Sequence, residues 1–510
     1  MNPATNPSLC GTSVLLTDAY KFPMAEAGAP LRHEVFYASH RKGGWQYVPL
    51  DIEAHIKSLL PRVDTEDYAY LDSHNYSLGA GARAAYAQTD KVEVRALPKG
   101  TWFCSREPIF SVAGPSALAS WPEPLALQIN FRTQVATCAL LNPERLPEMV
   151  ANATCDAEAD IVRETLDAVG VACPPITVRQ QDYYAAVRAR AEALVAILGD
   201  PNRAFEVGLR AAHCPEQHLI VLSALRDAGI LRTSNVYGAQ QLGMTPVGTM
   251  GHEHVQRYGS SYAAFCAMRD RVPGFVSYLP DTYSTLFEGV PSALRAMEEE
   301  DDRDAAIRFD AEAYIREQYI ASVAMARARN LNPRWFLESS WDDAKTLAFE
   351  TLRELLGIPR ERQGYGYGNF FVKPPWPHFG RDDVSAVYKL SQTGPFGRQK
   401  MGDEPGAAKE SIAGDLVLWR PHLGMAGYDG PCGYVAQRGE DWRPPVPASL
   451  LTGCPEVPPA VRFSPRDIAD IQRKHLAPLA LSPETLRIRE QCYRDRDVAI
   501  AASAKFHSPI

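Results

Sequence analysis

Residues 204–235, AFEVGLRAAHCPEQHLIVLSALRDAGILRTSN, decide the fold of this chain. The short apolar run at 204–209 predicts a strand, and the amphipathic pattern at 216–228 predicts the helix after it. The alternation then continues. Further strands are expected at 245–250, 275–279, 305–309 and 335–338. Helices are expected at 260–271, between the strand at 275–279 and residue 296, at 311–329 and at 342–356. Repeated strand–helix units predict a parallel sheet, either open or closed into a barrel.

A polar, charged or glycine residue follows each predicted strand of this region. These residues are Arg210, Ser234, His252, Asp281, Asp310, Ser339 and the pair Gly366 and Gly368. The carboxyl ends of parallel barrel strands meet on one face, where such folds build their sites. One Asp or Ser before a helix is usually an N-cap, but seven positions in register indicate a common site.

Composition limits the class of protein. The 510 residues carry 53 Lys and Arg against 61 Asp and Glu, a formal net charge of −8, and 45% are hydrophobic. The chain can therefore bury a full core, and its mild acidity argues against a nucleic-acid coat protein. No membrane span or secretory leader is expected, and ten isolated cysteines favour a reducing compartment. We expect a cytoplasmic protein without nucleic-acid or membrane partners.

The segments flanking the strand–helix region differ from it in composition. The first 150 residues mix short strand-like runs with turns, and residues 142–200 look like a helical insertion rich in Ala and Glu. A proline cluster at 373–377 precedes a strand expected at 385–390. The last 45 residues look helical.

Two histidines stand in the segment GTMGHEH at 248–254. His252 follows a glycine and could act as a nucleophile or as an acid–base group. Its spacing from His254 would place both rings on one strand face, as in zinc hydrolases. A zinc site needs further ligands, so we favour a structural role for His254.

Two other segments could bind phosphate. The YGYG turn at 365–368 can offer backbone N–H groups to an anion. The loop 394–414 carries Arg398, Lys400 and Lys409 and is either a solvated surface loop or a phosphate clamp.

Short motifs follow one another in a fixed order along the chain. They are LLTDAYK at 15–21, the basic residue Arg41, EPIFSVAG at 107–114, VGLR at 207–210, TSN at 233–235, VGTMGH at 247–252, DTY at 281–283, YGYG at 365–368, VYKL at 387–390 and the loop at 400–409. In this order they resemble the nicotinate phosphoribosyltransferases and, more distantly, the nicotinamide enzymes of the same superfamily. The resemblance covers most of residues 12–415.

The resemblance implies an irregular parallel α/β barrel beside an open-faced α/β sandwich built from both chain ends. It also implies a homodimer whose active sites are completed across the interface. We accordingly divide the chain into a sandwich part at 1–200 with the insertion at about 142–200, a barrel with the active site at 201–375, and a part at 376–510 that completes the sandwich and ends in a helical tail.

The reaction that the resemblance implies joins nicotinate to phosphoribosyl pyrophosphate in NAD salvage, giving nicotinate mononucleotide and pyrophosphate. It implies Mg²⁺, ATP as a co-substrate, and a phosphohistidine at His252. Asp281 and Asp310 could bind the ribose hydroxyls or Mg²⁺ and stabilise positive charge at the transition state. The metal ligands are otherwise left open.

Four further residues are candidates for substrate binding. Arg210 could pair with the nicotinate carboxylate, and Tyr20 could stack on the pyridine ring. Ser234 stands where the nicotinamide enzymes have an Asp, so it would not repel a carboxylate. Arg308 is the fourth. The candidates for phosphate binding are Arg41, Ser339, Gly366, Gly368, Lys400 and Lys409.

The chain departs from the family pattern at several points. The family's R-x-D-S-G-D is here RFDAE at 308–312, and Val207 replaces an aromatic residue. A transferase using nicotinamide or another pyridine, a catalytically inactive ligand-binding homologue and a metal-dependent barrel hydrolase therefore stay open as alternatives.

Overall fold

The structure is a computed structural model that describes residues 12–505 apart from 249, 273–276, 301, 303, 311–313, 404–409, 422–429, 446–450, 453–463 and 473–478. A curled parallel sheet has the strand order β10-β9-β8-β14-β13-β12-β11. Its strands are β8 (Ala204–Glu206), β9 (Arg232–Thr233), β10 (Thr245–Pro246), β11 (Ser277–Tyr278), β12 (Ala306–Phe309), β13 (Arg334–Leu337) and β14 (Gln363–Tyr367). The predicted parallel α/β barrel is thus confirmed as an open curl with β10 and β11 at its edges.

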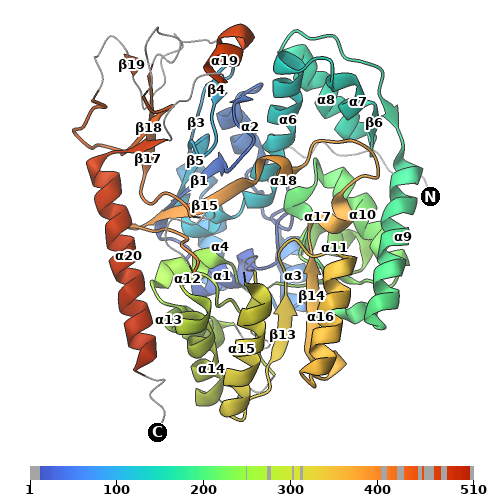
Figure 1. Ribbon diagram of the computed structural model, residues 1–510, viewed down its shortest axis with the longest axis vertical. Helices are drawn as coiled ribbons and strands as arrows, with labels where there is room; N and C mark the ends of the chain where they lie inside the picture. Colours follow the sequence, from blue (N-terminus) through green and yellow to red (C-terminus); the bar gives the residue numbers. More distant parts are fainter. Residues whose placement is uncertain are drawn as a thin grey trace.

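Helices connect successive strands of the curled sheet (Figure 1). They are α10 (Pro215–Asp227), α11 (Val236–Leu242), α12 (His252–Tyr258), α13 (Ser261–Arg271), α14 (Val290–Glu299), α15 (Ile315–Ala328) and α16 (Asp343–Leu355). The side chains of Asn235, Ser260 and Asp342 cap α11, α13 and α16. A capping oxygen satisfies a backbone N–H that the first helical turn leaves free. These caps fix the helix starts close to the strand ends.

A five-stranded antiparallel sheet joins the two ends of the chain. Its order is β16-β15-β1-β5-β3. The strands are β1 (His33–His40), β3 (Glu93–Ala96), β5 (Phe110–Pro115), β15 (Ala386–Thr393) and β16 (Phe396–Gly397). The central strand β1 pairs with β15 from the C-terminal part, with Ala38 opposite Tyr388. This confirms the expected sandwich built from both chain ends.

The beginning of the chain lies against the barrel. Ala19 N–H donates to Ser234 O at 2.7 Å, and Val236 N–H donates to Thr17 O at 3.2 Å. A Cβ on Gly248 would lie 2.6 Å from the Tyr20 backbone nitrogen, so this close approach requires glycine. Residues 17–20 are thereby held beside the strand end that carries Ser234, just before α1 (Lys21–Ala27).

Residues 146–198 include the helices α7 (Leu146–Val150), α8 (Asp156–Ala168) and α9 (Gln180–Leu198). Figure 1 shows α9 along one side of the barrel helices. The C-terminal part forms a second small sheet in the order β19-β17-β18-β20 and ends in the long helix α20 (Pro483–Ala504). Its strands are β17 (Leu416–Pro421), β18 (Tyr434–Gln437), β19 (Leu451–Thr452) and β20 (Ala480–Leu481). Within the described ranges, no helix combines the length and apolar character that a membrane crossing requires.

Candidate active site

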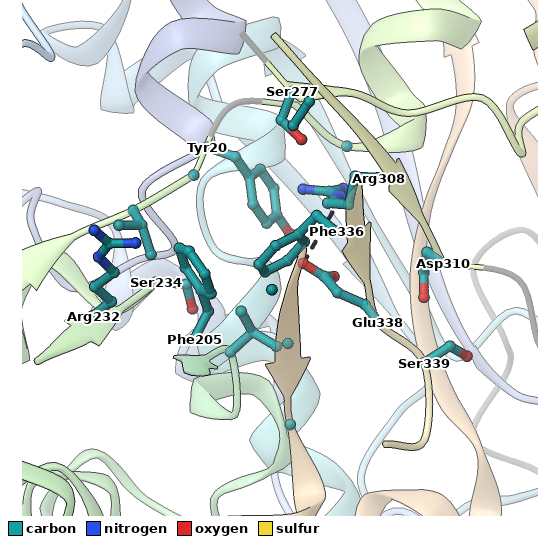
Figure 2. A pocket seen from close by; sticks show the side chains of 18 of the residues that line it. Tyr20, Phe205, Arg232, Ser234, Ser277, Arg308, Asp310, Phe336, Glu338 and Ser339 are labelled. Atoms are coloured by element: carbon teal, nitrogen blue, oxygen red, sulfur yellow. Dashed lines mark ion pairs between the residues drawn. The ribbon is translucent and has the colours of Figure 1, made fainter. Parts of the chain in front are cut away.

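A cavity of about 1290 Å³ opens at the carboxyl ends of the barrel strands and extends along the inner face of the sheet. Many of the residues expected from the sequence line it: Tyr20, Arg210, Ser234, His252, Arg308, Asp310, Ser339, Gly366 and Gly368. Figure 2 shows Tyr20 and Arg308 in the cavity, with Glu338 close to Arg308. The strand-end positions therefore do converge on one site.

His252 lies at the start of α12 and contacts groups from three other segments. Its Nδ1 lies 3.1 Å from Thr282 Oγ1, and its Nε2 lies 3.2 Å from Asp310 Oδ2 and 2.5 Å from Lys400 Nζ. Burial and the Lys400 ammonium hold the pKa of His252 well below its usual range, against the opposing effect of Asp310. A neutral ring with its proton on Nδ1 satisfies Thr282 and leaves the Nε2 lone pair for Lys400.

Asp281, Asp310 and His252 form a set of donors suited to a cation. One ligand atom from each residue lies within 4.8 Å of the other two. Asp281 is buried, whereas the Asp310 side chain is 38% exposed toward the cavity. Carboxylate oxygens are the ligands that Mg²⁺ prefers, and Lys400 already contacts the His252 nitrogen. The donor set therefore fits Mg²⁺ on the two aspartates better than a zinc ion on the histidine.

Arg210 and Tyr20 form the second part of the site. Arg210 Nη2 donates to the Tyr20 hydroxyl at 3.0 Å and to Asp18 Oδ2 at 3.2 Å. Ser234 Oγ donates to the other oxygen of Asp18 at 2.6 Å. The carboxylate of Asp18 thus holds the guanidinium of Arg210 with one oxygen and the hydroxyl of Ser234 with the other.

Glu123 is a second carboxylate, after Asp18, beside Tyr20 and Arg210. It accepts from Tyr20 Oη at 2.8 Å and from Lys21 Nζ at 2.7 Å, and it lies 3.7 Å from Arg210. Burial alone would raise the pKa of Glu123, but Lys21 and Arg210 hold it well below its usual range. Glu123 therefore stays ionised and fixes Tyr20 in place.

Arg308 and Glu338 extend the site along the inner face of the sheet. Arg308 Nη2 donates to Met250 O at 2.7 Å, and its Nε lies 3.9 Å from Glu338 Oε1, the pair joined by a dashed line in Figure 2. Burial raises the pKa of Glu338. Deeper in the cavity, Phe205 and Phe336 meet edge to face with ring centroids 4.4 Å apart. Both rings line the cavity and supply aromatic surface to it.

The glycine pair differs from the expected turn. Strand β14 includes Gly366, whose backbone pairs with Phe205, so its N–H does not belong to a free phosphate-binding loop. A Cβ at this position would lie 2.4 Å from Glu338 Cγ, so the glycine makes room for the side chains of the cavity. Gly368 and Ser339 do lie at strand ends facing the cavity, and Ser339 has a left-handed φ of 86°.

Several other residues considered from the sequence are not among those that line this cavity, and two of them, Asp281 and Lys400, lie beside His252. Arg41 lines a separate cavity of about 300 Å³. The placement of His254 on one strand face with His252 is wrong, because both lie in helix α12; His254 Nε2 donates to Ala264 O at 2.9 Å, as in a structural histidine. Lys409 lies outside the described residues.

Sequence reasoning missed Asp18, Glu123, Glu338 and Lys389 as residues of the site. Lys389 lies on β15, lines the main cavity, and has a pKa lowered to about 7 by burial. Asp18 and Lys389 stand inside the motifs LLTDAYK and VYKL, which was a usable signal. Each contact given above for the cavity is made within one chain, whereas the resemblance implies completion by a second.

Comparison with known proteins agrees with this description. No family model matches the chain. Nicotinate phosphoribosyltransferase of Bacillus subtilis (strain 168) is 28% identical over 218 residues, which are 41% of this chain and 41% of that protein. Nicotinate phosphoribosyltransferase pncB2 of Mycobacterium tuberculosis (strain H37Rv) is 38% identical over 81 residues, 16% of this chain and 17% of that one. The matches thus span less than half the length of these curated relatives.

Solved structures match over more of the chain. Nicotinate phosphoribosyltransferase from Vibrio cholerae has a TM-score of 0.55 at 17% identity, covering 79% of this chain and 92% of its own. The enzyme of that name from Porphyromonas gingivalis has a TM-score of 0.55 at 16% identity, with 78% and 95% covered. The chain therefore has the α/β fold of these two structures. Over less than half of its length, the chain is also similar in sequence, at low identity, to nicotinate phosphoribosyltransferases.

Proposed function

We propose that this protein transfers the phosphoribosyl group of phosphoribosyl pyrophosphate to nicotinate in NAD salvage. The ring nitrogen of nicotinate forms a bond to C1′ of the ribose, the bond from C1′ to the pyrophosphate oxygen breaks, and pyrophosphate leaves. One observation carries this proposal: Asp281, Asp310, His252 and Lys400 meet beside a cavity that also holds Arg210 and Tyr20.

Positive charge develops on the ribose as pyrophosphate departs. Asp310 and Asp281 lie on adjacent strand ends, where their carboxylates can bind ribose hydroxyls and stabilise that charge. The same two carboxylates would hold Mg²⁺, which when bound neutralises charge on the pyrophosphate. Lys400 and Lys389 add ammonium groups to the same end of the cavity.

Nicotinate would bind beside Tyr20 and Arg210, which contact each other. The guanidinium can pair with the substrate carboxylate in a two-pronged contact, and Tyr20 offers its ring face. Asp18 competes for the same guanidinium, so binding requires Arg210 to share its donors between two carboxylates. Ser234 uses its hydroxyl on Asp18 and adds no charge of its own.

ATP coupling belongs to the same proposal. A neutral His252 keeps a lone pair on Nε2 that can attack the terminal phosphorus of ATP, forming an N–P bond as ADP leaves. Lys400 lies where it would neutralise the transferred phosphoryl group. Hydrolysis of the phosphohistidine would then accompany transfer. A homodimer and a cytoplasmic location stay predictions.

The test uses purified protein with phosphoribosyl pyrophosphate, Mg²⁺ and labelled nicotinate, with and without ATP. We expect nicotinate mononucleotide and pyrophosphate in equal amounts, with more product when ATP is present. Turnover of nicotinamide alone would assign the protein to the nicotinamide enzymes. Binding of both substrates without turnover of either would make it an inactive ligand-binding homologue.

A further inference from the structure

A second cavity, of about 300 Å³, lies away from the barrel strand ends. One wall comes from β1 and β15 of the five-stranded sheet, with Tyr37, Ser39 and Val387. The opposite wall comes from β20 and helix α20. Residues 410–413 and Gln399 close it from the side of the basic loop. The cavity is therefore assembled from four segments that are far apart in the chain.

The charge of this cavity is positive. Arg41, Arg106 and Arg489 line it, against one carboxylate from Glu410. The Nε of Arg489 is out of contact with solvent and has no hydrogen-bond partner among the described residues. Guanidinium groups present donors in a fixed fork that matches the oxygens of phosphate. Their convergence in a small cavity favours a compact anion.

Gln399 provides an independent sign of a missing ligand. Its residue is 2% exposed, yet neither the Oε1 nor the Nε2 of its amide has a partner in the described part of the chain. A buried amide without hydrogen bonds costs free energy, so natural proteins seldom leave one. Here the amide lines the cavity, where its Nε2 could donate to a ligand oxygen.

Part of the remaining lining is apolar. Leu479 and Leu481 come from β20 and the residue before it, Leu486 comes from α20, and Ile412 comes from the segment after the basic loop. A cavity with a few polar groups and an apolar wall suits a small ligand that has both an apolar part and a charged group. Free phosphate would leave this apolar wall uncovered.

We propose that this second cavity binds a small phosphate monoester with a compact apolar body, held by Arg489, Gln399 and their arginine neighbours. The site goes beyond the proposed function, and its occupation can be measured without any turnover.

The second cavity and the main site share one stretch of backbone. Gln399 lines the second cavity, while the adjacent Lys400 reaches His252 Nε2 in the main site. Lys400 N–H donates to Ser411 Oγ at 3.0 Å, and Ser411 also lines the second cavity. A ligand that holds Gln399 and Ser411 would therefore hold the backbone that positions the Lys400 ammonium. Binding in the second cavity would thus affect the position of the Lys400 ammonium beside His252.

The test measures binding of phenyl phosphate to the full chain by equilibrium dialysis, with inorganic phosphate as the comparison. We expect Arg489→Ala and Gln399→Leu each to weaken phenyl phosphate binding at least about tenfold, with circular dichroism spectra like that of the unsubstituted protein. The matched control is Arg487→Ala, since Arg487 lies on the same helix with its side chain 60% exposed and paired with Glu484. Inorganic phosphate should bind more weakly than phenyl phosphate.

Two results would overturn the proposal. Either phenyl phosphate binds equally well to both folded cavity variants and to the unsubstituted chain, or its binding is lost in Arg308→Ala and kept in the cavity variants, which would place it in the main cavity. Neither result would touch the nicotinate assay, so failure here is distinguishable from failure of the proposed function.

Discussion

The ammonium of Lys400 lies 2.5 Å from Nε2 of His252, although 148 positions separate the two residues in the chain. The contact brings the loop that follows β16 onto the first residue of α12. It keeps the imidazole neutral and its lone pair directed toward a cation. Such a pair is suited to receive a phosphoryl group, because the nucleophile and the neutralising charge are already adjacent.

Replacing this lysine should change the titration of the histidine. In Lys400→Met the pKa of His252 rises toward its usual value of about 6.5, because a cation that disfavours the imidazolium is removed. The nitrogen shifts of His252, followed by NMR against pH, measure this. The exposed Lys99→Met is the control and should leave the titration unchanged. An identical His252 titration in the two variants would contradict the arrangement.

Arg210 should govern affinity for the acid substrate. Arg210→Lys is expected to raise the KM for nicotinate about tenfold or more, with a smaller change in kcat, because an ammonium cannot reproduce the two-pronged contact while also serving Asp18. Steady-state kinetics with nicotinate as the varied substrate measure the split. The control is Arg188→Lys, an exposed position on α9. If kcat alone fell and KM stayed the same, Arg210 would not bind the carboxylate.

Lys389 should impose a pH dependence on binding of the phosphorylated substrate. Its pKa is lowered to about 7 by burial, so the side chain is charged below that pH and neutral above it. The KM for phosphoribosyl pyrophosphate should therefore rise as the pH passes through 7. In Lys389→Met this KM should be high throughout and lose the dependence. A profile that the substitution leaves unaltered would remove Lys389 from the site.

Glu288 should contribute to the pH dependence of stability. Burial raises its pKa to about 7, against 4.5 for an ordinary glutamate, while Ser261 donates both its N–H and its hydroxyl to it. The folded state then holds a proton that the unfolded state releases, so this contribution is fully present below pH 4.5 and is lost as the pH rises to 7. The loss amounts to at most about 3 kcal/mol in the free energy of unfolding.

Urea unfolding of Glu288→Gln between pH 4.5 and 8 tests this assignment. The variant should lose less stability over that range than the unsubstituted chain, since glutamine has no proton to release. Glu317→Gln, at an exposed position of α15, serves as the comparison and should behave like the unsubstituted chain. Parallel curves for all three proteins would show that Glu288 does not titrate in this range.

The barrel and its strand-end residues could be predicted because one rule connects them. Alternating strands and helices give a parallel sheet, and the carboxyl ends of its strands share an edge, so Arg210, Ser234 and Asp310 had to converge. No such rule places Asp18 or Glu123. They reach the site through the path of the N-terminal segment and through the packing of α6 (Glu123–Leu141), which depend on contacts between distant segments.

One expectation differs from the structure for a physical reason. The expected turn at 365–368 assumed that the strand ends before Gly366, but backbone pairing with Phe205 continues through it. Local sequence indicates which residues follow a strand, but pairing decides where the strand stops and what it faces.

The pairing of β1 with β15 has a consequence for biosynthesis. Ser391 Oγ on β15 donates to Val35 O on β1, 356 positions earlier in the chain. During translation, the edge of β1 that pairs with β15 therefore stays unpaired until nearly four-fifths of the 510 residues have been synthesised. Open strand edges invite pairing with other chains, and contacts this distant slow folding. A truncated product ending before residue 386 would lack both this strand and the lysines of the site, leaving a barrel whose neighbouring sheet is open to aggregation.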